Sequence, residues 1–405
     1  MDLGPGYKQT EVGAIPEDWD VRPLKRISPS QSVGLVVNPS TYFDDAGDVP
    51  ILVGSNIREN SIVWESARRI SEESNHLLTS SRLVQGDLVT VRVGEPGVTA
   101  VIPPELDGCN CASVMIVRQH FSFDSHWLCY VMNSRMGRSQ VQHVQYGTAQ
   151  KQFNISDAIN FSYPVPPLAE QNAIAGALGD ADALIESIEQ LIAKKCHLKQ
   201  GAMQKLLRPK YGWVFKKLGE LASIQRGASP RPIESPIWFD DNSTIGWVRI
   251  SDVTCAGMFL RETTQKLSPL GVRNSRPVSR GSLIMSICAT VGRPIITEID
   301  TCIHDGFVVF DALRVNQHFL YYTLKSIEKD WANRGQTGSQ MNLNTALINR
   351  TEVATPRTER EQKEIVQVFL SMDAEIDALE ARLVKARQIK RGMMHNLLTG
   401  KIRLI

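Results

Sequence analysis

The sequence predicts an α+β protein in which two mixed α/β globular domains alternate with two long helices that pair as an antiparallel coiled coil. Residues 170–210 reappear as residues 361–401 at a constant offset of 191, with 14 of the 41 positions identical. Unrelated chains of ordinary composition would match at roughly two or three positions. The repeated segment has a helical apolar pattern, and short apolar runs fill the stretch before each copy. The chain is therefore a tandem duplication with a pseudo-two-fold arrangement.

The apolar positions of the repeated segment step by 4, 3, 4, 3 and 4 residues, which is the a and d spacing of a coiled coil. About 40 residues at roughly 1.5 Å each give a helix of about 60 Å, too long to rest on one small domain. Two equal seams would most simply pack together; the alternative is two amphipathic helices that each dock on their own globular half. The expected seam comprises Ile174, Leu178, Ala181, Ile185, Ile188, Ile192, Ile365, Phe369, Met372, Ile376, Leu379 and Leu383.

The expected organisation is a lead-in with a first globular domain over 1–165, a helix over 166–210, a second globular domain over 211–355 and a helix over 356–405. The two globular stretches agree at scattered positions, since Trp19, Leu24 and Ile27 parallel Trp213, Leu218 and Leu221. Apolar runs bounded by Gly, Pro and Asp predict strands. They are Leu88–Val93, Val114–Val117, Leu283–Cys288 and Phe307–Phe310.

Composition excludes several classes of protein. With 405 residues, 42% hydrophobic and 22% charged, the chain can bury two domain-sized cores. The first ten residues lack the apolar core that a signal peptide needs, and the sequence has no run of 18 apolar residues. We therefore expect a cytoplasmic protein without a membrane segment. The seven cysteines lack CxxC spacing, which favours free thiols. A zinc site remains an alternative, weakened by the short CxC step; its ligands would be Cys109, Cys111, His120 and His126.

Positive charge gathers at the end of each repeat. Residues 190–219 contain eight Lys or Arg and residues 381–405 contain seven, and neither stretch contains an acid. Complementing the helix macrodipole would account for two or three cations per helix. The remainder suggests a polyanion or an acidic protein surface nearby. Because the whole chain is only +2, the rest sums to −13, and any nucleic-acid contact must be patchy.

The loops of the two globular stretches differ more than their frames, and loops on a rigid frame commonly carry recognition. They are rich in side chains that contact phosphates and base edges. A solvated surface role is the alternative for each of them, and the shared Gln152/Gln340 and Asn154/Asn342 pairs fit fold or phosphate positioning better than base discrimination. The candidate DNA-binding residues are Arg58, Arg68, Arg69, Arg92, Lys151, Gln152, Asn154, Arg226, Arg231, Arg249, Arg273, Asn274, Arg276, Arg293, Gln340 and Asn342.

Signatures of common enzymes are missing from the sequence. It has no GxxxxGK[ST], GxGxxG, HExxH or GxSxG pattern. It also lacks the Asn or Asp followed by Pro-Pro-Tyr/Phe that marks adenine methyltransferases. We therefore predict no catalytic residue and no metal or cofactor site in this chain.

Four segments of the chain match the usual sequences of a known family. They are the opening Tyr7–Trp19, the helix entries Pro167–Gln171 and Pro356–Ile365, and the close Gly392–Lys401. On these segments the chain resembles a specificity (S) subunit of a type I restriction-modification system over nearly its whole length. Two target-recognition domains that alternate with two helical repeats make the resemblance specific. One departure is that Arg208–Trp213 leads into the second half without the opening of the first, so an equal docking contact there is not expected.

The resemblance implies a non-catalytic subunit that selects a bipartite, asymmetric DNA sequence. It also implies partners: two modification subunits that methylate adenine N6 with S-adenosylmethionine, and restriction subunits that use ATP and Mg to translocate and cut double-stranded DNA. A 60 Å helix covers at most some 18 base pairs at 3.4 Å each, so half-site centres about one helical turn apart are expected. The alternatives are an orphan DNA-binding module and a coiled-coil scaffold without an active methyltransferase partner.

Overall fold

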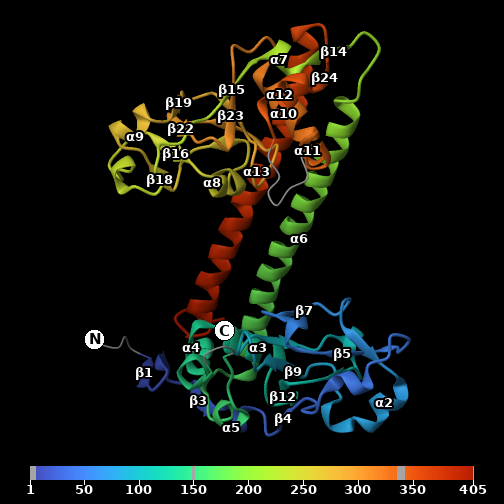
Figure 1. The fold of residues 1–405 in the computed structure, drawn as a ribbon. Coiled ribbons are helices and arrows are strands. Elements are labelled where there is room, and N and C mark those ends of the chain that lie inside the picture. The colour runs from blue at the N-terminus through green and yellow to red at the C-terminus, as the bar shows by residue number, and fades with distance from the viewer. Residues whose placement is uncertain (1–5, 148–150, 335–342, 405) are drawn as a thin grey trace. The chain divides into compact units, whose positions relative to one another are not determined.

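The computed structural model describes residues 6–147, 151–334 and 343–404 (Figure 1). The chain divides into two compact units, Met1–Glu189 with Ala381–Ile405, and Gln190–Glu380. Each unit contains one globular domain, part of one long helix and part of the other. The mixed domains and the paired long helices confirm the predicted fold class.

The first unit begins with short elements that lead into and out of its globular domain. They are β1 (Tyr7–Thr10), β2 (Gly13–Pro16), β3 (Asp20–Pro23), α1 (Leu24–Ile27) and β13 (Ser162–Val165). β1 and β2 form an antiparallel hairpin. β3 pairs antiparallel with β13, the strand that precedes the first long helix. The lead-in therefore lies beside the point where the chain leaves the domain.

Two sheets form the first domain within the described residues, in the orders β10–β9–β12–β4 and β11–β5–β8. Their strands are β4 (Gln31–Val33), β5 (Val49–Leu52), β8 (Arg68–Ile70), β9 (Leu88–Val91), β10 (Thr99–Val101), β11 (Asn110–Cys111) and β12 (Val114–Val117), and a separate hairpin joins β6 (Ile57–Arg58) to β7 (Ser61–Ile62). The helical segments are η1 (Pro39–Tyr42), η2 (Gly54–Asn56), α2 (Glu72–Leu77), η3 (Thr79–Ser81), η4 (Pro104–Leu106), α3 (Ser125–Asn133), α4 (Arg135–Val144) and α5 (Ile155–Ala158).

The second domain has sheets in the orders β15–β23–β20–β21–β17 and β18–β16–β22–β19, counted over its described residues, and the pair β14–β24 at its entry. Its strands are β14 (Val214–Lys217), β15 (Ser223–Arg226), β16 (Gly246–Val248), β17 (Phe259–Leu260), β18 (Gln265–Lys266), β19 (Arg276–Val278), β20 (Leu283–Ser286), β21 (Pro294–Thr297), β22 (Thr301–Ile303), β23 (Phe307–Asp311) and β24 (Glu352–Thr355). Its helical segments are α7 (Leu218–Leu221), η5 (Pro236–Trp238), α8 (Ile250–Cys255), α9 (Pro269–Arg273), α10 (Gln317–Ser326), α11 (Glu328–Arg334) and α12 (Thr345–Arg350).

The four predicted strands are β9, β12, β20 and β23, although β9 and β20 end two residues earlier than predicted. Nearly all of their residues are apolar, because the sheets β10–β9–β12–β4 and β15–β23–β20–β21–β17 are each covered on both faces. In β9, Leu88 joins one buried cluster and Val89 another. In β20, Leu283 and Ile284 divide in the same way. The two domains therefore share a frame, as the scattered sequence matches predicted.

The long helices α6 (Leu168–Leu206) and α13 (Glu359–Leu397) each contain 39 residues (Figure 1), or about 58 Å at 1.5 Å per residue. Thr358 caps α13, because its hydroxyl accepts a hydrogen bond from the amide of Glu361 at 3.3 Å. The helices run antiparallel in each unit. In the first, α13 pairs with α6 through Lys390 and Asp182 at 2.5 Å.

The predicted seam serves two kinds of packing. Its first members, Ile174 and Leu178 in α6 and Ile365 and Phe369 in α13, are buried in the cores of the globular domains. The end of the other helix completes each core: Leu397 and Leu398 in the first unit, and partly buried Leu206 and Leu207 in the second. Between these ends, Ile188 and Ile376 are buried and the other predicted members are half-buried. Docking on a domain and helix pairing thus occur on the same helix.

Candidate nucleic-acid interface

Three arginines predicted for the first domain lie on its small strands and are held by their own chain. Arg58 ends β6 and donates to two backbone carbonyls of its own turn at 2.9 and 3.1 Å. On β8, the guanidinium of Arg68 lies 5.2 Å from the ring centre of Phe43, and Arg69 donates to a backbone carbonyl at 2.9 Å. All three side chains remain exposed, so they can still reach an anion.

The remaining candidates of the first domain come together on two neighbouring loops. The residue after Arg92 forms a β-bridge with Gln152, and the backbone of Gln152 exchanges two hydrogen bonds of 2.9 Å with Tyr146. The Tyr146 hydroxyl donates to the side-chain oxygen of Asn154 at 2.9 Å. Lys151 is exposed on the same segment. The structure therefore joins Arg92 with residues 151–154, far apart in sequence, in one polar loop pair.

In the second domain, three candidate arginines gather at one end of β15. Arg226 donates from Nε to the backbone carbonyl of Asp305 at 2.7 Å, and Arg231 donates to the carboxylate of Asp305 at 3.2 Å. Arg276 donates to the side chain of Gln225 at 2.5 Å. The hydroxyl of a serine lowers the pKa of the Asp305 carboxyl, and Arg231 lowers it further. Asp305 was not predicted as a candidate, and it binds two of these three arginines.

Within the described residues, no hydrogen bond or ion pair joins the other candidates of the second domain to that group. Arg249 caps α8 and donates to a glutamine of β18 at 3.1 Å. Arg273 ends α9, and the side chain of Asn274 donates back to that helix at 2.9 Å. Arg293 is half-buried before β21. The predicted residues Gln340 and Asn342 lie outside the described residues.

Each domain is joined to the start of one long helix by the same hydrogen bond. In the first unit the indole nitrogen of Trp19 donates to Glu170 at 3.0 Å, and in the second that of Trp213 donates to Glu361 at 2.8 Å. The following glutamine of each helix accepts from the backbone amide of the residue that caps α3 or α10, at 3.0 and 2.9 Å. The repeated Glu-Gln pair thus fixes each domain to its helix.

A second repeated contact ties the domain to both long helices. The Tyr130 hydroxyl on α3 donates to Asp182 of α6 at 2.8 Å, and Lys390 of α13 pairs with the same carboxylate at 2.5 Å. The Lys390 ammonium also lies 5.5 Å from the Tyr130 ring centre. Burial raises the pKa of the Tyr130 hydroxyl, and the hydrogen bond to Asp182 raises it further, so the hydroxyl stays protonated. The second unit repeats this cluster with Tyr322, Asp373 and Lys199.

These anchoring residues were missed by the sequence reasoning, although the signal was available. Asp182 with Asp373 and Lys199 with Lys390 are identical in the two copies and lie off the apolar seam. Identity at polar positions of a drifted repeat indicates a shared contact rather than a shared solvated surface. The tyrosines could not be paired with them from sequence alone, because the Tyr130 to Asp182 bond spans 52 residues.

The units differ at the place where the last residues of the chain pack. Arg403 donates to both carboxylate oxygens of Glu170, at 2.7 and 2.8 Å, and to both of Asp18, at 2.9 and 2.7 Å. Hydrogen bonding to Arg403 lowers the pKa of Asp18. In the second unit Lys210 lies 5.8 Å from the ring of Trp213 instead. In the first unit, the segment after α13 is therefore held to the domain by these noncovalent bonds of Arg403, which we call the clamp. In the second unit the corresponding segment follows α6 and continues along the chain into β14.

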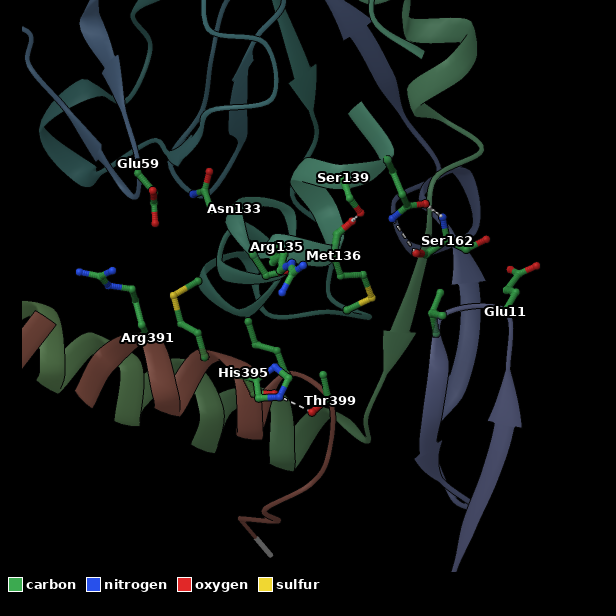
Figure 2. Close-up of a pocket in the computed structure, with 15 residues that line it drawn as sticks. Glu11, Glu59, Asn133, Arg135, Met136, Ser139, Ser162, Arg391, His395 and Thr399 are labelled. Atoms are coloured by element: carbon green, nitrogen blue, oxygen red, sulfur yellow. Dashed lines mark hydrogen bonds between the residues drawn. The ribbon is translucent and has the colours of Figure 1, made fainter. Parts of the chain in front are cut away.

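A hollow of about 1050 Å³ lies beside α4 and the end of α13 in the first unit. Figure 2 shows Arg135 and His395 on facing walls and Glu59 above Arg391. Its charged lining residues are two arginines and two glutamates, so opposite charges balance and the hollow has no excess that would attract a polyanion.

The cysteines of the alternative zinc site lie in the core. Cys109 and Cys111 are buried, and burial raises the pKa of the Cys109 thiol to about 12 and that of Cys111 further. Over residues 6–147, 151–334 and 343–404, no group of three or more His, Cys, Asp or Glu side chains is arranged to hold a metal ion. In the same ranges, no helix has the length and apolar character needed to cross a membrane.

Comparison with known proteins shows what the chain is similar to. Residues 210–387 match the model of the type I restriction modification DNA specificity domain. Two proteins of Methanocaldococcus jannaschii are similar to the chain, and both are named as type I restriction enzyme specificity subunits. The one named MjaX is 24% identical and aligns over 98% of this chain and 97% of its own length. The one named MjaVIII is 26% identical and aligns over 60% and 63%.

Solved structures have the same fold. A type I restriction-modification S subunit from M. genitalium superposes with a TM-score of 0.61 at 15% identity, over 98% of both chains. A chain from a study of the assembly and conformational transition of the type I R-M system gives 0.59 at 16% identity, over 96% of this chain and 99% of that one. The resemblance drawn from the opening, the helix entries and the close is confirmed.

Proposed function

We propose that this chain is the non-catalytic DNA-recognition subunit of a type I restriction-modification complex, because residues 210–387 match the model of the type I restriction modification DNA specificity domain. Each globular domain contacts one part of a bipartite, asymmetric target in double-stranded DNA. The long helices set the distance between the two parts. The subunit acts in the cytoplasm, where the DNA is.

The observation that carries this proposal is the duplication of the anchoring contacts. Glu170 and Glu361 receive the same tryptophan bond, and Asp182 and Asp373 bind the same tyrosine and lysine types. Two domains fixed in the same way to equivalent positions of two paired helices cannot slide along them. A protein that measures a distance on DNA needs this property, because a shift of one base pair turns the groove by about 36°.

The chemistry of methylation and cleavage belongs to partner subunits in this proposal. Two modification subunits would bind S-adenosylmethionine and methylate adenine N6, and restriction subunits would use ATP and Mg. The cationic ends of the helices support contact with DNA or with an acidic surface of a partner. Lys194, Lys205 and Arg391 are exposed there.

The decisive test is single-molecule sequencing of N6-methyladenine in cells with and without this chain. We expect one bipartite motif to disappear on deletion and to return when the full chain is restored from a plasmid. An unchanged set of methylated motifs would refute the proposal. Measuring DNA affinity at two salt concentrations separates the proposal from a protein scaffold. If the purified complex binds DNA through several phosphate contacts, its affinity falls steeply between low and moderate salt. A protein scaffold binds no DNA at either salt concentration.

The measuring role has its own test, a deletion of 187–193 from α6 together with 379–385 from α13. These are opposite heptads between the two anchoring clusters, so both clusters and the seam register are kept. Each deletion shortens its helix by about 10 Å, or about three base pairs at 3.4 Å. The two half-sequences should persist with an altered gap. The old gap in the deletion variant would refute the measuring role.

A further inference from the structure

The chain leaves β4 of the first domain and β15 of the second domain in the same way, but the side chains around these two points differ. Gly34 in the first domain follows β4, and a Cβ there would lie 2.8 Å from the carbonyl oxygen of Cys111. Gly227 follows β15, and a Cβ there would collide with the carbonyl oxygen of His304. In both domains the glycine therefore lies close to the backbone of a neighbouring segment. The next residues of the chain differ, since Cys111 leads into Ala112 and Ser113 whereas His304 leads into Asp305 and Gly306.

Asp305 holds the side chains around it in a fixed arrangement. Its carboxylate accepts from the hydroxyl of Ser229 at 2.6 Å and from Arg231 at 3.2 Å, and its backbone carbonyl accepts from Nε of Arg226 at 2.7 Å. The amide of Asp305 donates to the hydroxyl of Ser229 at 3.3 Å, which closes the loop on both sides. Two guanidinium groups are thus positioned by one residue.

Both guanidinium groups keep their outer nitrogens available. Arg226 uses Nε and Arg231 uses one terminal nitrogen, and in the described part of the chain their other nitrogens have no hydrogen-bond partner. The side chain of Arg231 is 71% exposed, and Arg226 is exposed. An arginine that is already ordered loses less conformational freedom when it binds than a free one. Ordered terminal nitrogens match the two acceptors, O6 and N7, that guanine presents in the major groove.

Space for a base edge lies next to this group. A hollow of about 700 Å³ begins at His304, the neighbour of Asp305, and is lined by Arg249, Gln265 and Phe239 among others. Arg249 and Gln265 are hydrogen bonded to each other at 3.1 Å. Polar side chains on its wall can contact the bases next to the one that an arginine reads.

We propose that Arg226 and Arg231, positioned by Asp305, determine base specificity in the second domain by donating to guanine in one part of the target. This inference rests on the proposed function and adds to it the residues that read the sequence. The difference between the domains supports it, because a residue that discriminates bases must differ between two domains that read different sequences. Arg226 and Arg231 are the specificity-determining residues, and Asp305 is a positioning residue.

The test replaces the chromosomal copy with Arg226→Ala, Arg231→Ala or Asp305→Asn and determines the N6-methyladenine motif by single-molecule sequencing. Arg261→Ala is the matched control, because Arg261 is also exposed, at 74%, and also bonds a carboxylate, that of Glu298 at 2.9 Å. Each arginine variant should relax a guanine position in one half of the motif. Discrimination against the wrong base there should fall about tenfold to hundredfold, and Asp305→Asn should relax the same positions less. The other half and the gap should not change.

Each outcome decides a different statement. No motif in the unaltered strain refutes the proposed function itself. A normal motif in that strain that stays unchanged in both arginine variants overturns the inference alone. A uniform loss of methylation at every site without any relaxed position also overturns it, because phosphate contacts weaken binding without changing specificity. Equal relaxation in Arg261→Ala would overturn it as well, since that residue lies outside the group.

Discussion

Arg403→Ala should destabilise the first unit far more than an ordinary exposed substitution. Arg403 makes four charge-assisted hydrogen bonds of 2.7–2.9 Å to Glu170 and Asp18. Glu170 is 4% exposed, so its charge would stay buried when the guanidinium is lost. Removing one partner of a buried ion pair costs about 3–5 kcal/mol.

The lower end of that range applies here, for two structural reasons. Trp19 still donates to Glu170 at 3.0 Å, and the Arg403 side chain is itself 23% exposed. Asp18 is 53% exposed, so its loss of the pair contributes little. We expect the free energy of unfolding of the first unit to fall by about 3 kcal/mol, or its midpoint by roughly 6–12 °C for a unit of this size.

Calorimetry of the full chain, with hydrogen exchange to assign each transition to a unit, measures this effect. Lys401→Ala is the control, because Lys401 is exposed in the same segment and bonds only His395 among the described residues. A second variant, Glu170→Gln combined with Arg403→Ala, removes the unpaired charge and should recover part of the loss. If Arg403→Ala and Lys401→Ala shift the midpoint equally, the clamp does not stabilise the unit and the reasoning is wrong.

Three further perturbations give distinct outcomes. Lys390→Met removes an ammonium that is 13% exposed and should lower the free energy of unfolding by about 2 kcal/mol in a denaturant titration. The control is Arg387→Met, which breaks an ion pair that is about half exposed and should change the free energy of unfolding by less than about 0.5 kcal/mol. Burial lowers the pKa of His304 below 6.5. As the pH falls from 7 to 5, the unfolded state therefore binds this proton before the folded state does, and the free energy of unfolding falls in that window. His304→Gln should make the free energy of unfolding less dependent on pH there, and an unchanged slope would contradict this. Gly292→Ala would drive a Cβ into the tryptophan ring of α11 at a positive φ, and should cost about 2 kcal/mol more than Gly281→Ala, where φ is also positive but the space is open.

Periodicity predicted the elements but not their partners. The steps of 3 and 4 residues gave both long helices, and the continuous apolar runs gave β9, β12, β20 and β23. The same steps could not distinguish packing on a helix from packing in a domain. Ile174 and Ile365 therefore fell into the predicted seam although domain cores bury them. An apolar position states that a face is covered, and only long-range contacts state by what.

The candidate interface was predictable as residue types and not as groups. Arg226 and Arg231 were singled out as arginines in predicted loops, but Asp305, which positions both, lies more than 70 residues away in the sequence. Arg92 and Lys151 were likewise predicted separately, and loop contacts bring them together. Long-range hydrogen bonds of this kind have no local pattern, because neither partner needs a particular neighbour in sequence.

In each domain, the residues that hold the fold together differ from those that we propose for recognition. The contacts that hold each domain on the helices are buried or half-buried and repeat between the copies, as Asp182 and Asp373 do. The arginines at the end of β15 are exposed and do not repeat, as Arg226 and Arg231 show. Substitution of an exposed residue usually changes stability by less than about 0.5 kcal/mol. The loops after β4 and β15 can therefore vary without loosening the anchors. If the proposed function holds, a chain of this design can acquire a new half-target in one domain while the half-target of the other domain and the gap in the target stay the same.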